Sequence, residues 1–153
     1  MSSPVVLAAW EPVVVRLGGE DAIGWKELFA EAGDGGLRYA QANPERSNSG
    51  LAALVAQFFA GAEAAEGKQL TSLSRAEIDD PRVRAFVAKV HENVVQYGQS
   101  TGFFADKMAV GGPAYADAVV LYESDVIQAN NHIRVRGLGF PTLVAVYPKA
   151  VSY

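Results

Sequence analysis

The sequence contains no cysteine, which excludes disulfide frameworks, thiolate metal sites and cysteine nucleophiles. Its only two histidines, His91 and His132, are too far apart for the short spacing of a histidine-based zinc site. We therefore expect neither a metal site nor a cofactor. No apolar run approaches the roughly 18 residues that span a bilayer, and Met1-Ser2-Ser3-Pro4 lacks the basic start of a secretory signal.

Positive charge is also scarce. The 13 Lys and Arg residues are outnumbered by 17 Asp and Glu, giving a formal net charge of -4. Nucleic-acid-binding proteins usually present a basic patch, and the one dense basic cluster here is Arg134 and Arg136 beside His132. We expect no nucleic-acid partner. Nucleotide-binding glycine motifs and the nucleophile elbow of hydrolases are absent as well, so nothing in the sequence requires an enzyme.

What the sequence does contain is apolar residues, half of its 153, in alternating strand and helix patterns. Short β-branched runs predict strands over 5–10, 37–40, 118–122 and 142–147, the last ended by Pro148. Helical spacing predicts helices over 11–17, 25–32, 51–66, 83–97, 103–110 and 124–130, and Ser74-Arg75-Ala76-Glu77 has the form of a capping box. This alternation favours a single α/β domain over 1–153, a three-layer sandwich whose mixed, mainly parallel sheet has helices on both faces.

Two of these helices carry specific expectations. The helix over 51–66 should present one apolar face to the core, made of Leu51, Leu54, Val55, Phe58, Phe59 and Ala62. The helix over 83–97 carries His91 beside its apolar face, which favours a surface or boundary role over a catalytic one. Neither helix by itself indicates a reaction.

Two polar loops are the best places for a ligand. Ser47-Asn48-Ser49-Gly50 and Gln99-Ser100-Thr101-Gly102 each lead into a helix, where α/β proteins gather ligands at the carboxyl ends of their strands. A helix N-terminus offers up to four unpaired N–H groups and a partial positive charge. Small polar residues let an anion approach that backbone, yet Ser and Asn are also ordinary N-caps. Both interpretations stay open.

Four segments carry a family resemblance: Ser3–Ala8, Asn43–Gly50, Tyr97–Met108 and Ala118–Ser124. Together they resemble type 2 periplasmic or extracellular solute-binding proteins of the molybdate/sulfate-like superfamily, in the form found in bacterial surface proteins with a von Willebrand factor A domain. The resemblance covers most of the chain. It implies that this chain is the second lobe of a two-lobed protein, excised from a longer chain. The lobe would begin at one hinge crossing and end at the return crossing, Val144–Pro148.

The resemblance also implies a function. A small polar or anionic solute would bind between this lobe and the missing first lobe, in the cell envelope or outside the cell, with a membrane permease of the ABC type as a further partner. The implied ligand-facing residues are Ser47, Asn48 and Ser49 with the Gly50 backbone, Ser100 and Thr101, and Tyr122 and Glu123. Glu123 would repel an oxyanion and suit an amine or a polyol. Alternatively it caps a helix that starts at Ser124, which we expect.

A different class of function is the alternative. The domain could mediate protein interactions on a bacterial surface after losing its solute. An exposed apolar patch around Phe103, Phe104 and Met108 would favour that hypothesis. Such a patch would also favour a homo-oligomer through the exposed lobe face, because large apolar patches seldom stay bare.

Overall fold

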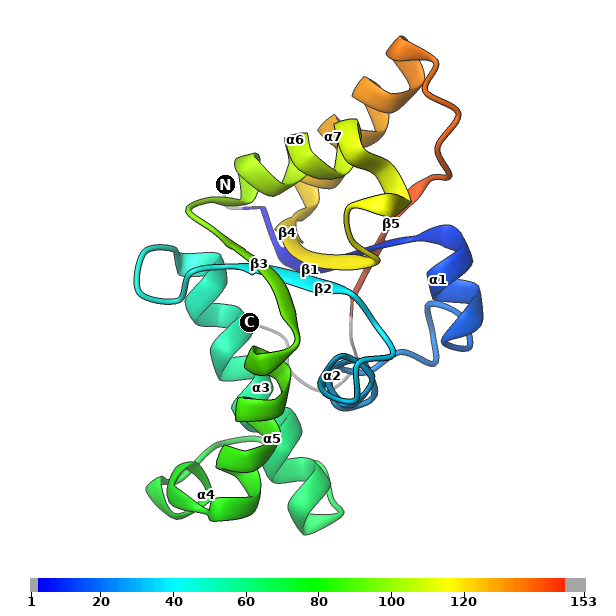
Figure 1. Ribbon diagram of the computed structural model, residues 1–153. Helices are drawn as coiled ribbons and strands as arrows, with labels where there is room; N and C mark the ends of the chain where they lie inside the picture. Colours follow the sequence, from blue (N-terminus) through cyan, green and yellow to red (C-terminus); the bar gives the residue numbers. More distant parts are fainter. Residues whose placement is uncertain (1–2, 148–153) are drawn as a thin grey trace.

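The computed structural model describes residues 3–147 as a five-stranded sheet between two layers of helices (Figure 1). The strands are β1 (Val5–Trp10), β2 (Tyr39–Ala42), β3 (Val94–Gly98), β4 (Ala118–Tyr122) and β5 (Leu143–Val146). The helices are α1 (Glu11–Arg16), α2 (Trp25–Gly33), α3 (Asn48–Glu66), α4 (Arg75–Asp79), α5 (Pro81–Glu92), α6 (Thr101–Gly111), the 3-10 turn η1 (Gly112–Ala114) and α7 (Glu123–Arg136). The predicted α/β class is confirmed.

The sheet is mixed, with strand order β3-β2-β4-β1-β5. Strand β2 pairs in parallel with β3 and β4, whereas β1 is antiparallel to both β4 and β5. Four strands therefore run in one direction and β1 runs in the other. Because parallel strands share their ends, the carboxyl ends of β2, β3 and β4 lie at one edge of the sheet.

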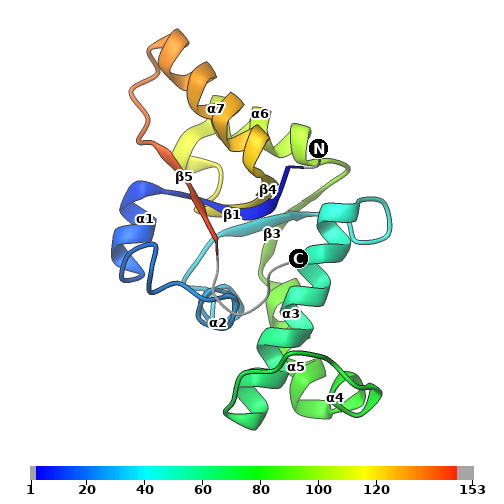
Figure 2. The ribbon, with the colours of Figure 1, turned by 180° about the vertical axis from the view of Figure 1, so that it is seen from behind.

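Each face of the sheet has its own apolar core. One core includes Leu28 and Phe29 of α2 and the alanines of α3. The other includes Phe104 and Met108 of α6 and Val126 of α7. Figures 1 and 2 show α6 and α7 together on one side of the sheet and α2, α3 and α5 on the opposite side. The expected arrangement of helices on both faces is present.

The helix predicted over 83–97 is wrong in its last five residues. Helix α5 ends at Glu92, and after Asn93 the chain continues as β3, an edge strand of the sheet. The spacing of Val90, Val94 and Tyr97 fits a helical period, so periodicity predicts a helix that continues past Asn93. The signal that it overlooked is the pair Val94-Val95, since β-branched residues favour strands.

The apolar face expected for the helix over 51–66 is also wrong, except at Ala62. In α3 the fully buried apolar side chains are small, Ala53, Ala56, Ala60 and Ala62, and of these only Ala62 belongs to the predicted face. The larger residues Leu54, Val55, Phe58 and Phe59 are only half-buried, and Leu51 is 51% exposed. Nearly every residue between Leu51 and Ala62 is apolar, so periodicity could not choose a face. The alanine face of α3 packs on the sheet because its small side chains let the helix lie close to the strands.

Smaller boundary differences have local causes. Strand β2 covers 39–42 rather than 37–40, and α7 continues six residues beyond the expected Asn130 to Arg136, where Gly137 ends it with a φ of 61°. The capping box at Ser74 and Glu77 is confirmed. The predicted last strand is confirmed as β5, while Pro148 and the rest of its hinge crossing lie outside the described residues.

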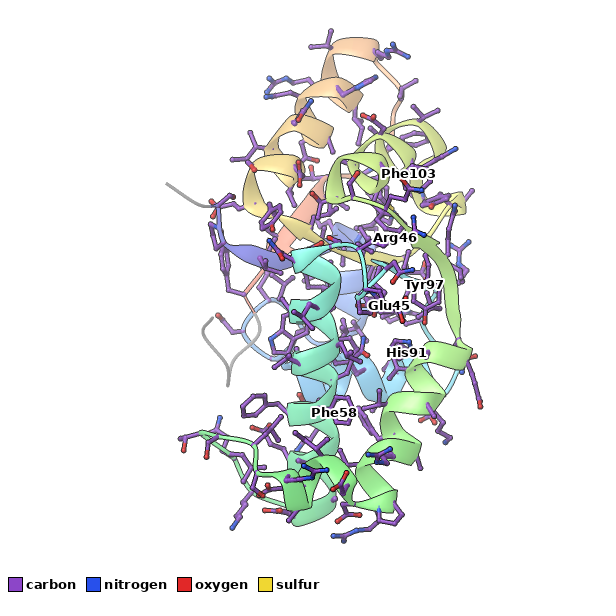
Figure 3. The ribbon with its side chains drawn as sticks, turned by 90° about the vertical axis from the view of Figure 1, so that its left-hand side faces the viewer. Glu45, Arg46, Phe58, His91, Tyr97 and Phe103 are labelled. Atoms are coloured by element: carbon purple, nitrogen blue, oxygen red, sulfur yellow. The ribbon has the colours of Figure 1, made fainter. Side chains whose placement is uncertain are left out.

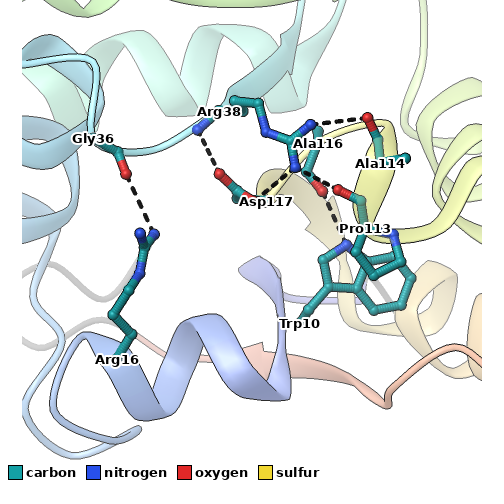
Figure 4. A network of polar contacts seen from close by, with 8 residues as sticks. All are labelled: Trp10, Arg16, Gly36, Arg38, Pro113, Ala114, Ala116 and Asp117. Carbon is teal, nitrogen blue, oxygen red and sulfur yellow. Dashed lines mark hydrogen bonds and ion pairs between the residues drawn. The ribbon is translucent and has the colours of Figure 1, made fainter.

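The opposite edge of the sheet is closed by a polar network (Figure 4). The Arg38 guanidinium donates to the carbonyl oxygens of Pro113 and Ala114, at 2.5 and 2.9 Å, and pairs with Asp117 at 3.0 Å. The other Asp117 oxygen accepts the Arg38 amide at 2.8 Å. Buried Trp10 Nε1 donates to the Ala116 carbonyl at 2.9 Å. These bonds tie the start of β2 to the start of β4, so this edge serves the fold.

Candidate functional site

The two polar loops predicted to hold a ligand, and the predicted pair Tyr122 and Glu123, meet at one edge of the sheet. They follow β2, β3 and β4, which are neighbours and run in parallel. The Asn43 amide donates to the Gly98 carbonyl at 2.8 Å, which joins the beginnings of the first two loops. Helix α3 leaves this edge on one face of the sheet, whereas α6 and α7 leave it on the other (Figure 2).

Helix α3 starts unusually close to the end of β2, and Gly50 makes this possible. A Cβ atom at Gly50 would lie 2.5 Å from the Ala42 carbonyl oxygen and 2.7 Å from the Asn43 carbonyl group. Both are backbone atoms, so they cannot move aside as a side chain could. Gly50 therefore has a packing role in addition to the backbone role expected of it, and Ser49 beside it is buried.

The first turn of α3 leaves its amides free. Ser47 is the N-cap residue, but its hydroxyl does not accept a helix amide and lies instead 2.9 Å from the Ser49 hydroxyl. Within residues 3–147, no acceptor meets the N–H groups of Asn48, Ser49 or Gly50. The hydroxyl capping that the sequence left as one alternative is therefore not found at α3. Three donors at the positive end of a 19-residue helix therefore have no acceptor within residues 3–147, and of the three residues Asn48 is exposed while Ser49 and Gly50 are buried.

Helix α6, by contrast, is capped in the ordinary way. The Ser100 hydroxyl accepts the Phe103 amide at 3.2 Å, and Thr101 is buried as the first residue of the helix. The predicted second loop thus serves its own helix. Phe104 and Met108 are fully buried and Phe103 is half-buried, so the apolar patch considered around these residues does not exist.

The start of α7 is covered by the beginning of the chain. Glu123 is the first helical residue, and its amide donates to the Pro4 carbonyl at 3.0 Å. The Ser124 amide is capped by the Ser3 hydroxyl at 3.0 Å, so the expectation that Glu123 caps a helix starting at Ser124 is wrong. A hydrogen bond with Glu123, with a smaller effect of burial, raises the pKa of the Tyr147 hydroxyl. Tyr122, the last residue of β4, is half-buried.

Five hydrogen-bonded polar side chains, here called the polar chain, link β2, α3, α5 and β3, and the sequence reasoning missed them. Gln57 Nε2 donates to Gln41 Oε1 at 2.6 Å, and the Tyr39 hydroxyl donates to the same oxygen at 3.1 Å. Outward from Gln57, its Oε1 lies 2.8 Å from His91 Nε2, and His91 Nδ1 lies 2.5 Å from the Tyr97 hydroxyl. The available signal was two glutamines in otherwise apolar segments. Figure 3 shows His91 and Tyr97 on the β3 side of α3, with Glu45 and Arg46 nearby.

Burial sets the protonation of this chain. Burial raises the pKa of Tyr39 far above its usual range and also raises the pKa of Tyr97. It lowers the pKa of His91, because a half-buried imidazolium is poorly solvated. At neutral pH the side chains of the polar chain, from Tyr39 to Tyr97, are therefore all uncharged.

Four surface cavities of about 220 to 450 Å³ lie away from the predicted site residues. They flank α1 and α2 or lie between the end of α7 and β5. Within residues 3–147, no three His, Asp or Glu side chains come together as a metal ion would need. Of the helices in this part of the chain, none has the length and apolar character to cross a membrane.

Comparison with known proteins adds no relative. No protein-family model, no curated protein and no solved structure matches the chain. Its function therefore has to be argued from the geometry described above.

Proposed function

We propose that the chain is a ligand-binding lobe that holds a small polar or anionic solute at the N-terminus of α3. The single observation that carries this proposal is that the amides of Asn48, Ser49 and Gly50 have no acceptor among the described residues 3–147. Such amides, at the positive end of a helix and at the carboxyl edge of a sheet, form an anion-binding arrangement. Arg46, exposed two residues earlier, adds a positive charge.

The finer fold assignment belongs to the same proposal. The resemblance to type 2 solute-binding proteins would make this chain one lobe of a two-lobed extracellular or cell-envelope protein, with a first lobe and a permease as partners. A lobe alone supplies one wall of a cleft, whereas ligand sites usually bury most of their ligand. Because α6 and α7 are capped from within the chain, Ser100, Thr101, Tyr122 and Glu123 contribute less than the α3 loop.

A protein-interaction domain is the second candidate. The observation that favours it is the outer side of α3, where Leu51 is 51% exposed and several large apolar residues are only half-buried. A self-associating protein would bury this side in a homo-oligomer, which light scattering detects. A monomer that binds a solute at the α3 amides would favour the first candidate.

The decisive experiment removes one α3 amide without removing the helix. Proline is tolerated at the first helical position, where its missing N–H has no helical partner, and Ser47 already has the extended φ of -141° that a residue before proline prefers. Asn48→Pro should therefore weaken binding of sulfate, phosphate or molybdate severalfold while the thermal stability holds. The measurement is an amide NMR titration with each anion.

The matched control is Asn48→Ala, which changes the same side chain and keeps the amide. It should bind like the unchanged protein. If the amide resonances of 48–50 do not move with any anion, amino acid or sugar, or if both variants bind as tightly as the unchanged protein, the α3 site is wrong.

A further inference from the structure

The polar chain from Tyr39 to Tyr97 links the core to the surface through one titratable group, His91. Its inner members Tyr39, Gln41 and Gln57 are fully buried, whereas Tyr97 is 41% exposed. The Tyr97 hydroxyl and His91 Nδ1 are 2.5 Å apart and form a direct hydrogen bond. The two rings are stacked, with their centroids 5.8 Å apart. A change of charge at His91 therefore acts directly on a surface hydroxyl.

The inner half of the chain fixes which imidazole nitrogen carries the proton. The amide group of Gln57 has Nε2 committed to Gln41, so its Oε1 faces His91 and can only accept. Nε2 of His91 must then carry a hydrogen. In the neutral ring Nδ1 is consequently bare, and it accepts the hydrogen of the Tyr97 hydroxyl.

We propose that His91 and Tyr97 form a pH-operated switch that reverses the hydrogen-bonding character of the Tyr97 hydroxyl at the surface. With His91 neutral, the hydroxyl hydrogen is held by Nδ1, and Tyr97 offers only acceptor lone pairs to other groups. When Nδ1 takes up a proton it becomes a donor to the Tyr97 oxygen. The hydroxyl hydrogen is then released and Tyr97 becomes a donor to solvent or to a bound acceptor.

The charged residues around His91 belong to its own helix α5 and to the loop before α3. No charged side chain occurs in α3 between Asn48 and Ala62, in β2 or in β3. On α5 itself Lys89 is paired with Asp34 at 3.3 Å and Glu92 is exposed. Tyr97 is the titratable group in contact with the imidazole, and Glu45 and Arg46 of the preceding loop lie nearby (Figure 3). Burial, which lowers the pKa of His91, places the transition on the acid side of an ordinary histidine.

The test is an NMR titration of the unmodified chain from mildly alkaline to acid pH, with His91→Gln used to assign the two histidines. We expect the neutral His91 ring to carry its hydrogen on Nε2. We also expect the Cζ resonance of Tyr97 to shift with the midpoint of His91, far below the pH at which a tyrosine ionises. Tyr115, whose hydroxyl donates to Gln96 at 2.6 Å on the other face, is the internal control and should not follow that midpoint.

Two results would overturn the inference: a neutral ring with its hydrogen on Nδ1, or a Tyr97 resonance that stays flat while His91 titrates. A second variant tests the origin of the tautomer. Gln57→Leu removes the acceptor for Nε2–H, so the neutral ring should become a mixture of both tautomers and the Tyr97 shift should shrink. An unchanged single tautomer in this variant would contradict the assigned role of Gln57. None of these outcomes depends on the solute proposed above.

Discussion

The two helical layers of this protein differ in what they bury and in how their helices begin. The α6 and α7 layer encloses an apolar core, and both of its helices are capped by hydroxyl or carbonyl groups. The layer with α3 and α5 buries Gln41 and Gln57 in its core, and the first amides of α3 find no partner in the part of the chain that the structure describes. Unpaired or buried polar groups cost stability. Buried polar atoms without a partner among residues 3–147 occur in both layers, Gln41 Nε2 in one and Asp125 Oδ2 and His132 Nε2 of α7 in the other. What distinguishes the α3 layer is its connected series of buried polar side chains, and that layer is where we place the function.

The strongest test of this comparison is a pair of core substitutions. Leu121→Ala in the α6 and α7 layer should cost about 2–5 kcal/mol, because a fully buried side chain leaves a cavity. Gln57→Leu in the α3 layer should cost about 1–3 kcal/mol, because Gln41 and His91 each lose a partner. Urea denaturation of both variants gives the two values. A stabilising effect of Gln57→Leu would mean that the hydrogen bonds of the polar chain do not contribute to the free energy of unfolding.

Helix starts give the next largest difference. Gly50→Ala should cost about 1–3 kcal/mol, since the new methyl group meets immobile backbone of β2. Gly102→Ala, in the first turn of α6, is the control. The nearest atom to its added Cβ would be the Ser100 hydroxyl at 3.9 Å, so alanine should be neutral or stabilising by about 0.5–1 kcal/mol. Equal losses at both glycines would show that the close approach of α3 is not special.

The smallest effect concerns the two serine N-caps. Ser100→Ala should cost about 1 kcal/mol, because its hydroxyl accepts the Phe103 amide. Ser47→Ala should stay within about 0.5 kcal/mol, because its hydroxyl contacts Ser49 instead of a helix amide. Thermal unfolding of the two variants measures the difference. A larger loss at Ser47 would indicate that α3 is capped after all.

Much of the architecture was accessible to sequence reasoning. Strands β1, β4 and β5 are short β-branched runs bounded by turn residues, and α3 ends at Gly67 as expected because glycine adopts the left-handed conformation there, with a φ of 69°. The α3 loop was recognised as a candidate because serines and asparagines cluster before a helix. Local chemistry of this kind does not depend on the rest of the fold.

Other features had no local signal strong enough to decide them. Val94 and Tyr97 fit a helix as well as a strand, and only pairing with β2 made them β3. The polar chain needed Gln41, Gln57 and His91 to meet from three separate elements. The capping of α7 by Ser3 joins residues 121 positions apart.

The sequence by itself therefore determined the alternation of strands and helices, the breaks at glycines and prolines, and the polar character of the loop before α3. Tertiary structure decided which face of α3 is buried, which helix amides find acceptors, and which nitrogen of His91 carries the hydrogen. The physical reason is that propensity and periodicity are properties of neighbouring residues, whereas a hydrogen bond or a close packing contact needs two surfaces that only the folded chain brings together.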